Sequence, residues 1–154
     1  MEPIEDSLSR RKAPTRDQLS QLRAEELRHK ADHLAGQARP TGQGHLVTQR
    51  VTGIAPDELR GLAADTLRRV QPGPAVVILG AEHKGKALLA AAVSSDLHQG
   101  GTQASRILTD AARTVGGGSG GLGPIASAGG RRTEALVQAL NTAAAEASHL
   151  LTHR

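Results

Sequence analysis

Four stretches of this chain repeat apolar residues every three or four positions, which is the spacing of one face of an α-helix. They predict helices over residues 15–39, 56–70, 102–114 and 133–149. In the second stretch, Pro56 suits a first helical turn, because the amides of that turn have no partner within the helix. Arg68 and Arg69 suit the last turn of the same helix, where the helix dipole is negative.

Four other stretches have the alternating or continuous apolar character of β-strands. They cover residues 45–53, 75–79, 88–93 and 125–128. The continuous apolar run 75–79 predicts a strand buried on both faces, and 88–93 predicts its partner across a loop that holds His83, Lys84, Gly85 and Lys86. Because strands and helices alternate along the chain, the sequence predicts an α/β fold with a mixed β-sheet covered by helices and preceded by an N-terminal helical arm.

The pattern divides the chain into three parts. Residues 1–14 have no periodicity and are expected to form a flexible tail, residues 15–39 the helical arm, and residues 45–151 a globular domain. The arm carries a narrow apolar stripe made of Leu19, Leu22, Leu27, Ala31, Leu34 and Ala38. A stripe of this width fits docking on the chain's own domain and pairing with a second copy equally well.

The segment 116–130 has an unusual density of glycine. Each glycine costs conformational entropy on folding, so such a run indicates either a slack linker or a surface that needs bare amides and positive φ angles. The predicted helices on both sides argue against a linker. We interpret the segment as a glycine loop, a short strand and a helix N-terminus beside Arg131 and Arg132, which would form an anion site. The alternative is a tight turn that allows close strand packing, with both arginines solvated.

The candidate nucleic-acid or phosphate-binding residues are therefore the loop glycines, the serine among them and the flanking cations. They are Gly116, Gly117, Gly118, Ser119, Gly120, Gly121, Gly129, Gly130, Arg131, Arg132, Lys84 and Lys86.

Composition limits how a ligand is recognised. The 154 residues include no Phe, Trp or Tyr, so bases cannot stack on aromatic rings, and any bound RNA is read through its backbone, shape or 2′-hydroxyls. The net charge of +4 is a slight excess spread over the chain. Cysteine is absent, which excludes disulfides and thiol nucleophiles. No apolar stretch reaches bilayer length and the N-terminus lacks the features of a signal peptide, so we expect a cytoplasmic protein and no membrane partner.

The sequence holds no catalytic constellation, such as an activated serine or a paired set of carboxylates. His29 and His33 share one helical face, as do His149 and His153, but neither pair has the further ligands of a metal site. We interpret both pairs as exposed histidines, and we expect no metal and no cofactor.

The glycine segment resembles a known signature. Val-Gly-Gly at 115–117 and Ala-Ser-Ala-Gly-Gly at 126–130 resemble the DHH-associated domain, most of all the C-Ala version that closes alanyl-tRNA synthetase. The family pattern reads Gly-Gly-Lys-Gly-Gly-Gly-Arg-Pro followed by Ala-Gln-Ala-Gly-Gly, and the spacing matches without a gap. The resemblance covers residues 45–151. The family's two basic loop residues fall on Gly118 and Leu122 here, so two phosphate contacts are missing, and the Arg131–Arg132 pair would compensate in part.

This resemblance implies a non-catalytic tRNA-binding module that grips the outer corner of the tRNA, as a fragment or a free-standing relative of the synthetase domain. It implies tRNA as a partner, and alanyl-tRNA synthetase or a second copy as a partner of the 15–39 helix. Two alternatives stay open. One is a homo-oligomerisation or protein-interaction module in which the glycine loop is structural. The other is a degenerate phosphate-binding remnant of a DHH-type phosphoesterase.

Overall fold

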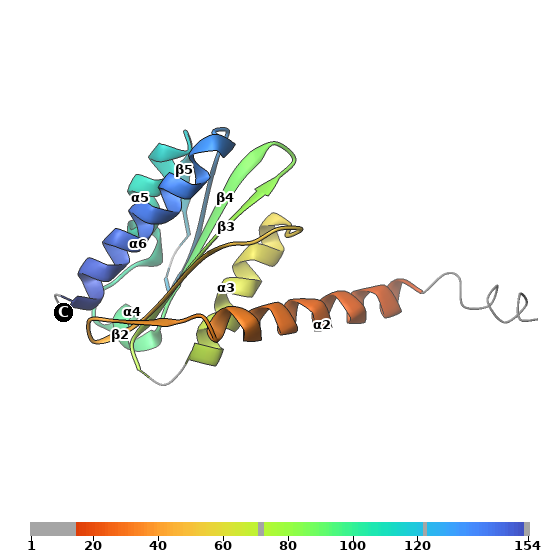
Figure 1. The fold of residues 1–154 in the computed structure, drawn as a ribbon, viewed down its shortest axis with the longest axis horizontal. Helices are drawn as coiled ribbons and strands as arrows, with labels where there is room; N and C mark the ends of the chain where they lie inside the picture. The colour runs from red at the N-terminus through yellow and green to blue at the C-terminus, as the bar shows by residue number, and fades with distance from the viewer. Residues whose placement is uncertain (1–14, 71–72, 122, 153–154) are drawn as a thin grey trace, which may run out of the picture.

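The computed structural model describes residues 15–70, 73–121 and 123–152, and within these ranges six strands form one mixed sheet (Figure 1). The strands are β1 (Arg39–Thr41), β2 (Gly44–Arg50), β3 (Ala75–His83), β4 (Lys86–Val93), β5 (Gly118–Gly120) and β6 (Ile125–Gly130). Their order across the sheet is β1-β2-β3-β4-β6-β5. Strands β2 and β3 are parallel and the other neighbours are antiparallel, which confirms the predicted mixed sheet.

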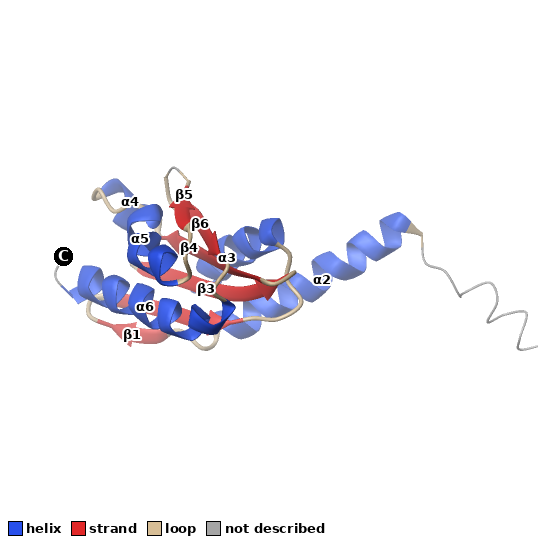
Figure 2. Ribbon diagram, turned by 90° about the horizontal axis from the view of Figure 1, so that it is seen from above, coloured by secondary structure: helices blue, strands red, loops and turns tan. Residues whose placement is uncertain are grey.

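Helices cover both faces of this sheet (Figure 2). Helix α3 (Pro56–Val70) connects the two parallel strands and packs on one face, while α5 (Ala104–Thr114) and α6 (Leu136–Thr152) pack on the other. A 3-10 turn (Thr133–Ala135) precedes α6, and the short α4 (Ser95–Gln99) follows β4. Because helices cover both faces, the central strands are apolar on both sides, as the continuous run at 75–79 predicts.

The core is built without aromatic rings. Along β3, Val77 and Leu79 face α3, whereas Val76 and Ile78 face α5 and α6. Alanines fill much of β4, and Gly80 lets α6 come close, since a Cβ there would lie 2.9 Å from Cδ2 of Leu140. Because these residues are small, the helices pack closer to the sheet, and the core is filled without large side chains.

The N-terminal arm is helix α2 (Arg16–Ala35), which begins with a capping box between Thr15 and Gln18. Its C-terminal half packs against the domain, where Ala31 and Leu34 are buried. Its N-terminal half projects beyond the sheet (Figure 1), and Leu19 and Leu22 there are 53% and 57% exposed. The helix begins where it was predicted but ends at Ala35, four residues before the predicted limit, and its apolar stripe serves the chain's own core only over its second half. The domain limits 15–39 and 45–151 stay predictions.

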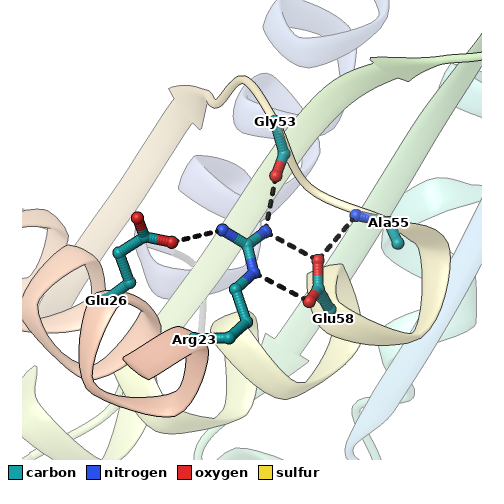
Figure 3. Close-up of polar contacts among 5 residues, drawn as sticks. All are labelled: Arg23, Glu26, Gly53, Ala55 and Glu58. Carbon is teal, nitrogen blue, oxygen red and sulfur yellow. Dashed lines mark hydrogen bonds and ion pairs between the residues drawn. The ribbon is translucent and has the colours of Figure 1, made fainter. Parts of the chain in front are cut away.

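Arg23 fastens the arm to the start of α3 (Figure 3). Its guanidinium donates to both carboxylate oxygens of Glu58 at 2.7 and 2.9 Å, to the carbonyl of Gly53 at 2.5 Å and to Glu26 at 2.6 Å. Glu58 also accepts the amide of Ala55 at 3.0 Å. The hydrogen bonds from Arg23 are the main cause that lowers the pKa of Glu58 from 4.5 to about 2.

Three short elements were not expected from the sequence. Residues 39–41, expected at the end of the helical arm and just after it, form β1 and pair with β2. Residues 118–120, placed in a loop, form β5 and pair with β6. Residues 95–99 form α4. Strands of three residues and a helix of five contain fewer than two full repeats of their periods, too few to give a recognisable pattern, so the surrounding tertiary structure decides them.

Candidate functional site

The start of the glycine segment is the C-terminal cap of α5. Gly116 has a φ of +79°, and its amide donates to the carbonyl of Arg113 at 3.0 Å. The amide of Gly117 donates to the carbonyl of Ala112 at 2.9 Å. These two bonds make a Schellman motif, which closes a helix with a left-handed glycine. The first two amides of the segment are therefore used within the chain and are not presented to a ligand.

Gly117 and Gly130 also allow close backbone packing. A Cβ on Gly117 would overlap the carbonyl oxygen of Gly129, and a Cβ on Gly130 would overlap that of Val115. Gly118 and Gly120 differ, because a Cβ at either position would have no atom within 4 Å. Close backbone packing thus explains the glycines at 117 and 130 and does not explain those at 118 and 120.

The predicted lysines lie at the β3–β4 hairpin. The strands run further than expected, so that His83 pairs with Lys86 and the turn contains only Lys84 and Gly85. Both turn residues have positive φ, 51° and 77°, as in the two-residue turns that match the twist of a hairpin. Lys84 is consequently at the exposed tip, and Lys86 belongs to β4 instead of the loop.

The hairpin end and the end of β6 meet at a groove of about 350 Å³, which we call the basic groove. Its lining is Lys86, Ala87, Leu88, Gly116, Gly117, Gly129, Gly130 and Arg131. It therefore unites half of the predicted site residues, with two exposed cations above a floor of glycine backbone. Among the described residues, neither Lys86 nor Arg131 forms an ion pair.

Arg132 and Lys84 are not part of this lining. The amide of Arg132 donates to the carbonyl of Val115 at 3.0 Å, and its side chain packs over Gly116, with Cγ 3.4 Å from where a Cβ of that glycine would be. The helix expected at residue 133 starts as a 3-10 turn, and α6 follows from Leu136. The two neighbouring arginines thus have different surroundings. Leu122, the other position of a family basic residue, lies outside the described residues.

A second hollow, which the sequence analysis missed, lies between α3 and the β5–β6 hairpin. This α3 groove has a volume of about 450 Å³ and is lined by Asp57, Arg60, Gly61, Ala64, Gly120, Gly121, Ile125, Ala126 and Ser127. The four α3 residues follow the i, i+3, i+4, i+7 spacing of one helical face. Gly61 was the one signal of this groove in the sequence, because a glycine inside a helix costs stability. Packing does not explain it, since a Cβ at Gly61 would have no atom within 4 Å.

Neither metal binding nor membrane insertion is indicated by the described residues. They contain no cluster of three or more metal-ligating side chains. His29 and His33 lie exposed on α2, and His153 lies outside the described residues. None of the helices in these ranges has both the length and the apolar character to cross a bilayer.

Comparison with known proteins supports the resemblance that the glycine signature suggests. The alanine–tRNA ligase of Thermobifida fusca is 34% identical over 137 residues, and that of Herpetosiphon aurantiacus is 38% identical over 136 residues. Each alignment covers 88% of this chain and 15% of the ligase, so the chain spans about a seventh of these relatives.

A solved structure shares the fold. The crystal structure of the C-Ala domain from Aquifex aeolicus alanyl-tRNA synthetase matches with a TM-score of 0.60 at 22% identity, over 75% of this chain and 97% of that domain. The sequence model of the DHHA1 domain matches residues 43–149. Since that match covers well over half of its residues, the chain belongs to the DHHA1 domain family.

Proposed function

We propose that this chain is a non-catalytic tRNA-binding module in which the basic groove contacts the phosphate backbone. The relatives are alanine–tRNA ligases, and the solved structure with the same fold is a synthetase C-Ala domain. The observation that carries the proposal is that Lys86 and Arg131 line the same groove beside glycine backbone. Neither cation has a carboxylate partner among the described residues. Cations left unpaired beside a surface without side chains suit close approach of a polyanion.

The composition determines what kind of contact this groove makes. Without aromatic residues the chain has no stacking platform, so binding depends on charge and on the shape of a folded RNA. Affinity should then fall with salt, by a slope of about 0.7 to 0.9 for each phosphate contacted. With two cations in the groove, the slope attributable to it is about 1.5.

The test measures binding of a tRNA(Ala) transcript by filter retention over a series of KCl concentrations. The double variant Lys86→Ala/Arg131→Ala is compared with Arg16→Ala/Arg106→Ala, which removes the same charge from exposed positions outside the basic groove. We expect the first pair to flatten the salt slope by about 1.5 and the second to leave it almost unchanged. An acceptor-stem microhelix, which lacks the D and T loops, should bind more weakly than the whole tRNA. Equal slopes for both pairs would contradict a phosphate contact at this groove.

One observation favours a second function, association through the arm. Leu19 and Leu22 are more than half exposed on the projecting half of α2, where this apolar surface has no use in the chain's own core. A second copy or a synthetase would be the partner of this surface. Light scattering of the pure protein checks self-association, and Leu19→Gln/Leu22→Gln should abolish any dimer without affecting the salt slope of tRNA binding.

A further inference from the structure

We infer that the basic groove continues along β6 into the α3 groove, and that Arg60 is a further phosphate-contacting residue on this track. The inference rests on the proposed function, because it specifies how far the bound backbone runs. It assigns a role to residues that the glycine signature does not include.

The continuity comes from shared lining residues. A hollow of about 230 Å³, lined by Pro56, Leu59, Arg60, Leu88, Leu89, Ser127 and Ala128, lies between the two grooves. It shares Leu88 with the basic groove and both Arg60 and Ser127 with the α3 groove. The three hollows therefore form one track along β6.

The register of the strands shows why the floor of this track is nearly bare. Gly129 pairs with Leu88 and with Gly118, and Ser127 pairs with Gly120. Paired residues point to the same face of a sheet, and Leu88 packs with the residues under α3. On the α3 side, β5 thus presents Gly118 and Gly120, and β6 presents Ile125, Ser127 and Gly129, so Ile125 is the one large side chain on this part of the sheet. Helix α3 packs mainly over β3 and β4 and contacts β6 less, and hollows remain between α3 and β6.

The wall of the track that α3 forms also carries a residue without a side chain. Gly61 faces the groove from inside α3, although nothing within 4 Å of a Cβ requires a glycine there. Arg60 is exposed and forms no ion pair among the described residues. Asp57 is the one carboxylate in the lining, at the first turn of α3.

A nucleic-acid backbone fits this track better than an extended peptide does. Strand β6 is paired on both sides, by β4 and by β5, and the edge strand β5 is only three residues long, so the track offers little open edge to which a peptide strand could be added. Apart from Ile125, the α3 groove offers little to anchor an apolar side chain. The two arginines of the track are also well separated. Arg60 lies beside Ser127, and Ser127 is four residues before Arg131, which is about 13 Å along an extended chain. Arg60 and Arg131 would therefore contact different phosphates.

Arg131 and Arg132 directly follow β6 and have different surroundings. Arg131 lines the basic groove together with Gly129 and Gly130. Arg132 is not part of this lining, and its side chain packs over Gly116. The two neighbours are therefore a matched pair with the same charge, of which only one should contact RNA.

The test measures tRNA(Ala) binding against KCl for Arg60→Ala, Arg60→Lys, Arg132→Ala and the control Arg106→Ala. Arg60→Ala should flatten the salt slope by about 0.7 to 0.9, Arg60→Lys should preserve it, and the other two should match the wild type. If Lys86→Ala/Arg131→Ala weakens binding but Arg60→Ala behaves like Arg106→Ala, the track is wrong and the proposed function stands. If the wild type does not bind tRNA, the proposed function fails.

A second pair of variants does not depend on removing an arginine. Gly61→Glu adds a carboxylate to the wall of the track, and Gly61→Ala adds only a methyl group in open space. We expect Gly61→Glu to weaken tRNA binding about fivefold and Gly61→Ala to bind as the wild type does, with both melting at or above the wild-type temperature. Unchanged affinity in Gly61→Glu, together with lost binding to a synthetase fragment, would instead assign the groove to a protein and overturn the inference.

Discussion

Replacing Glu58 by Gln should loosen the arm and make the stability of the domain less dependent on pH. Glu58 receives two hydrogen bonds from Arg23 and one from the amide of Ala55 (Figure 3). Gln keeps an oxygen for the Ala55 amide but loses the charge that Arg23 contacts. The variant therefore isolates the attachment of α2 to α3 without removing side-chain volume.

The magnitude follows from the pKa of Glu58. A fall from 4.5 to about 2 would correspond to about 3 kcal/mol for a fully buried pair. The side chains of Arg23 and Glu58 are 34% and 26% exposed, so solvent screens much of this energy. We expect Glu58→Gln to lower the free energy of unfolding by about 1 to 2 kcal/mol at pH 7.

The pH dependence has a definite sign. Because the folded state lowers the pKa of this carboxyl, its contribution is present in full above about pH 4.5 and is lost as the pH falls toward 2. Urea unfolding of the wild type and Glu58→Gln at pH 7, 5, 4 and 3 should show two curves that converge on acidification. Arg23→Ala should be non-additive with Glu58→Gln at pH 7. A difference that is the same at pH 3 and pH 7 would refute the assignment of this energy to the ion pair.

Three further predictions concern the glycines. Gly117→Ala should unfold the domain or lower its melting temperature strongly in thermal circular dichroism, because its Cβ would overlap the carbonyl of Gly129, whereas Gly118→Ala, in open space, should melt close to the wild type. Gly118→Lys restores a family cation in the same open space, so it should fold and steepen the salt slope of tRNA binding by about 0.7 to 0.9. Gly61→Ala should raise the free energy of unfolding in urea by roughly 1 kcal/mol, because alanine is the better helix former.

The sequence predicts the long elements well because their apolar residues are buried as the periodicity requires. Leu59, Leu62 and Ala63 are buried on the inner face of α3, and the run 75–79 is buried on both sides. The pattern could not separate the two halves of α2, since Leu19 and Leu34 belong to one stripe but only Leu34 meets the domain. A stripe records which residues are apolar, and tertiary packing decides which of them are covered.

The candidate site was predictable only in part, for a related reason. Lys86 and Arg131 are far apart in the sequence. The register that pairs Ala87 of β4 with Gly130 of β6 brings them close together. Arg60 gave no signal, because an exposed arginine on a helix resembles any solvated charge. Only the lateral position of α3 relative to β6 places it beside Ser127, and no short-range pattern encodes that position.

The glycines of the 116–130 segment are of two kinds, those that the fold requires and those that it does not. Gly116, Gly117 and Gly130 are required by the helix cap and by the contact between backbones, so any chain with this fold needs them whether or not it binds RNA. A match to the glycine pattern therefore supports the fold more directly than it supports binding. Under the proposed function, binding depends on the cations placed around the glycines, and those differ here from the family pattern at Gly118. If the track along β6 carries the backbone, Arg60 and Arg131 supply contacts from the sheet face that the loop no longer supplies from its edge.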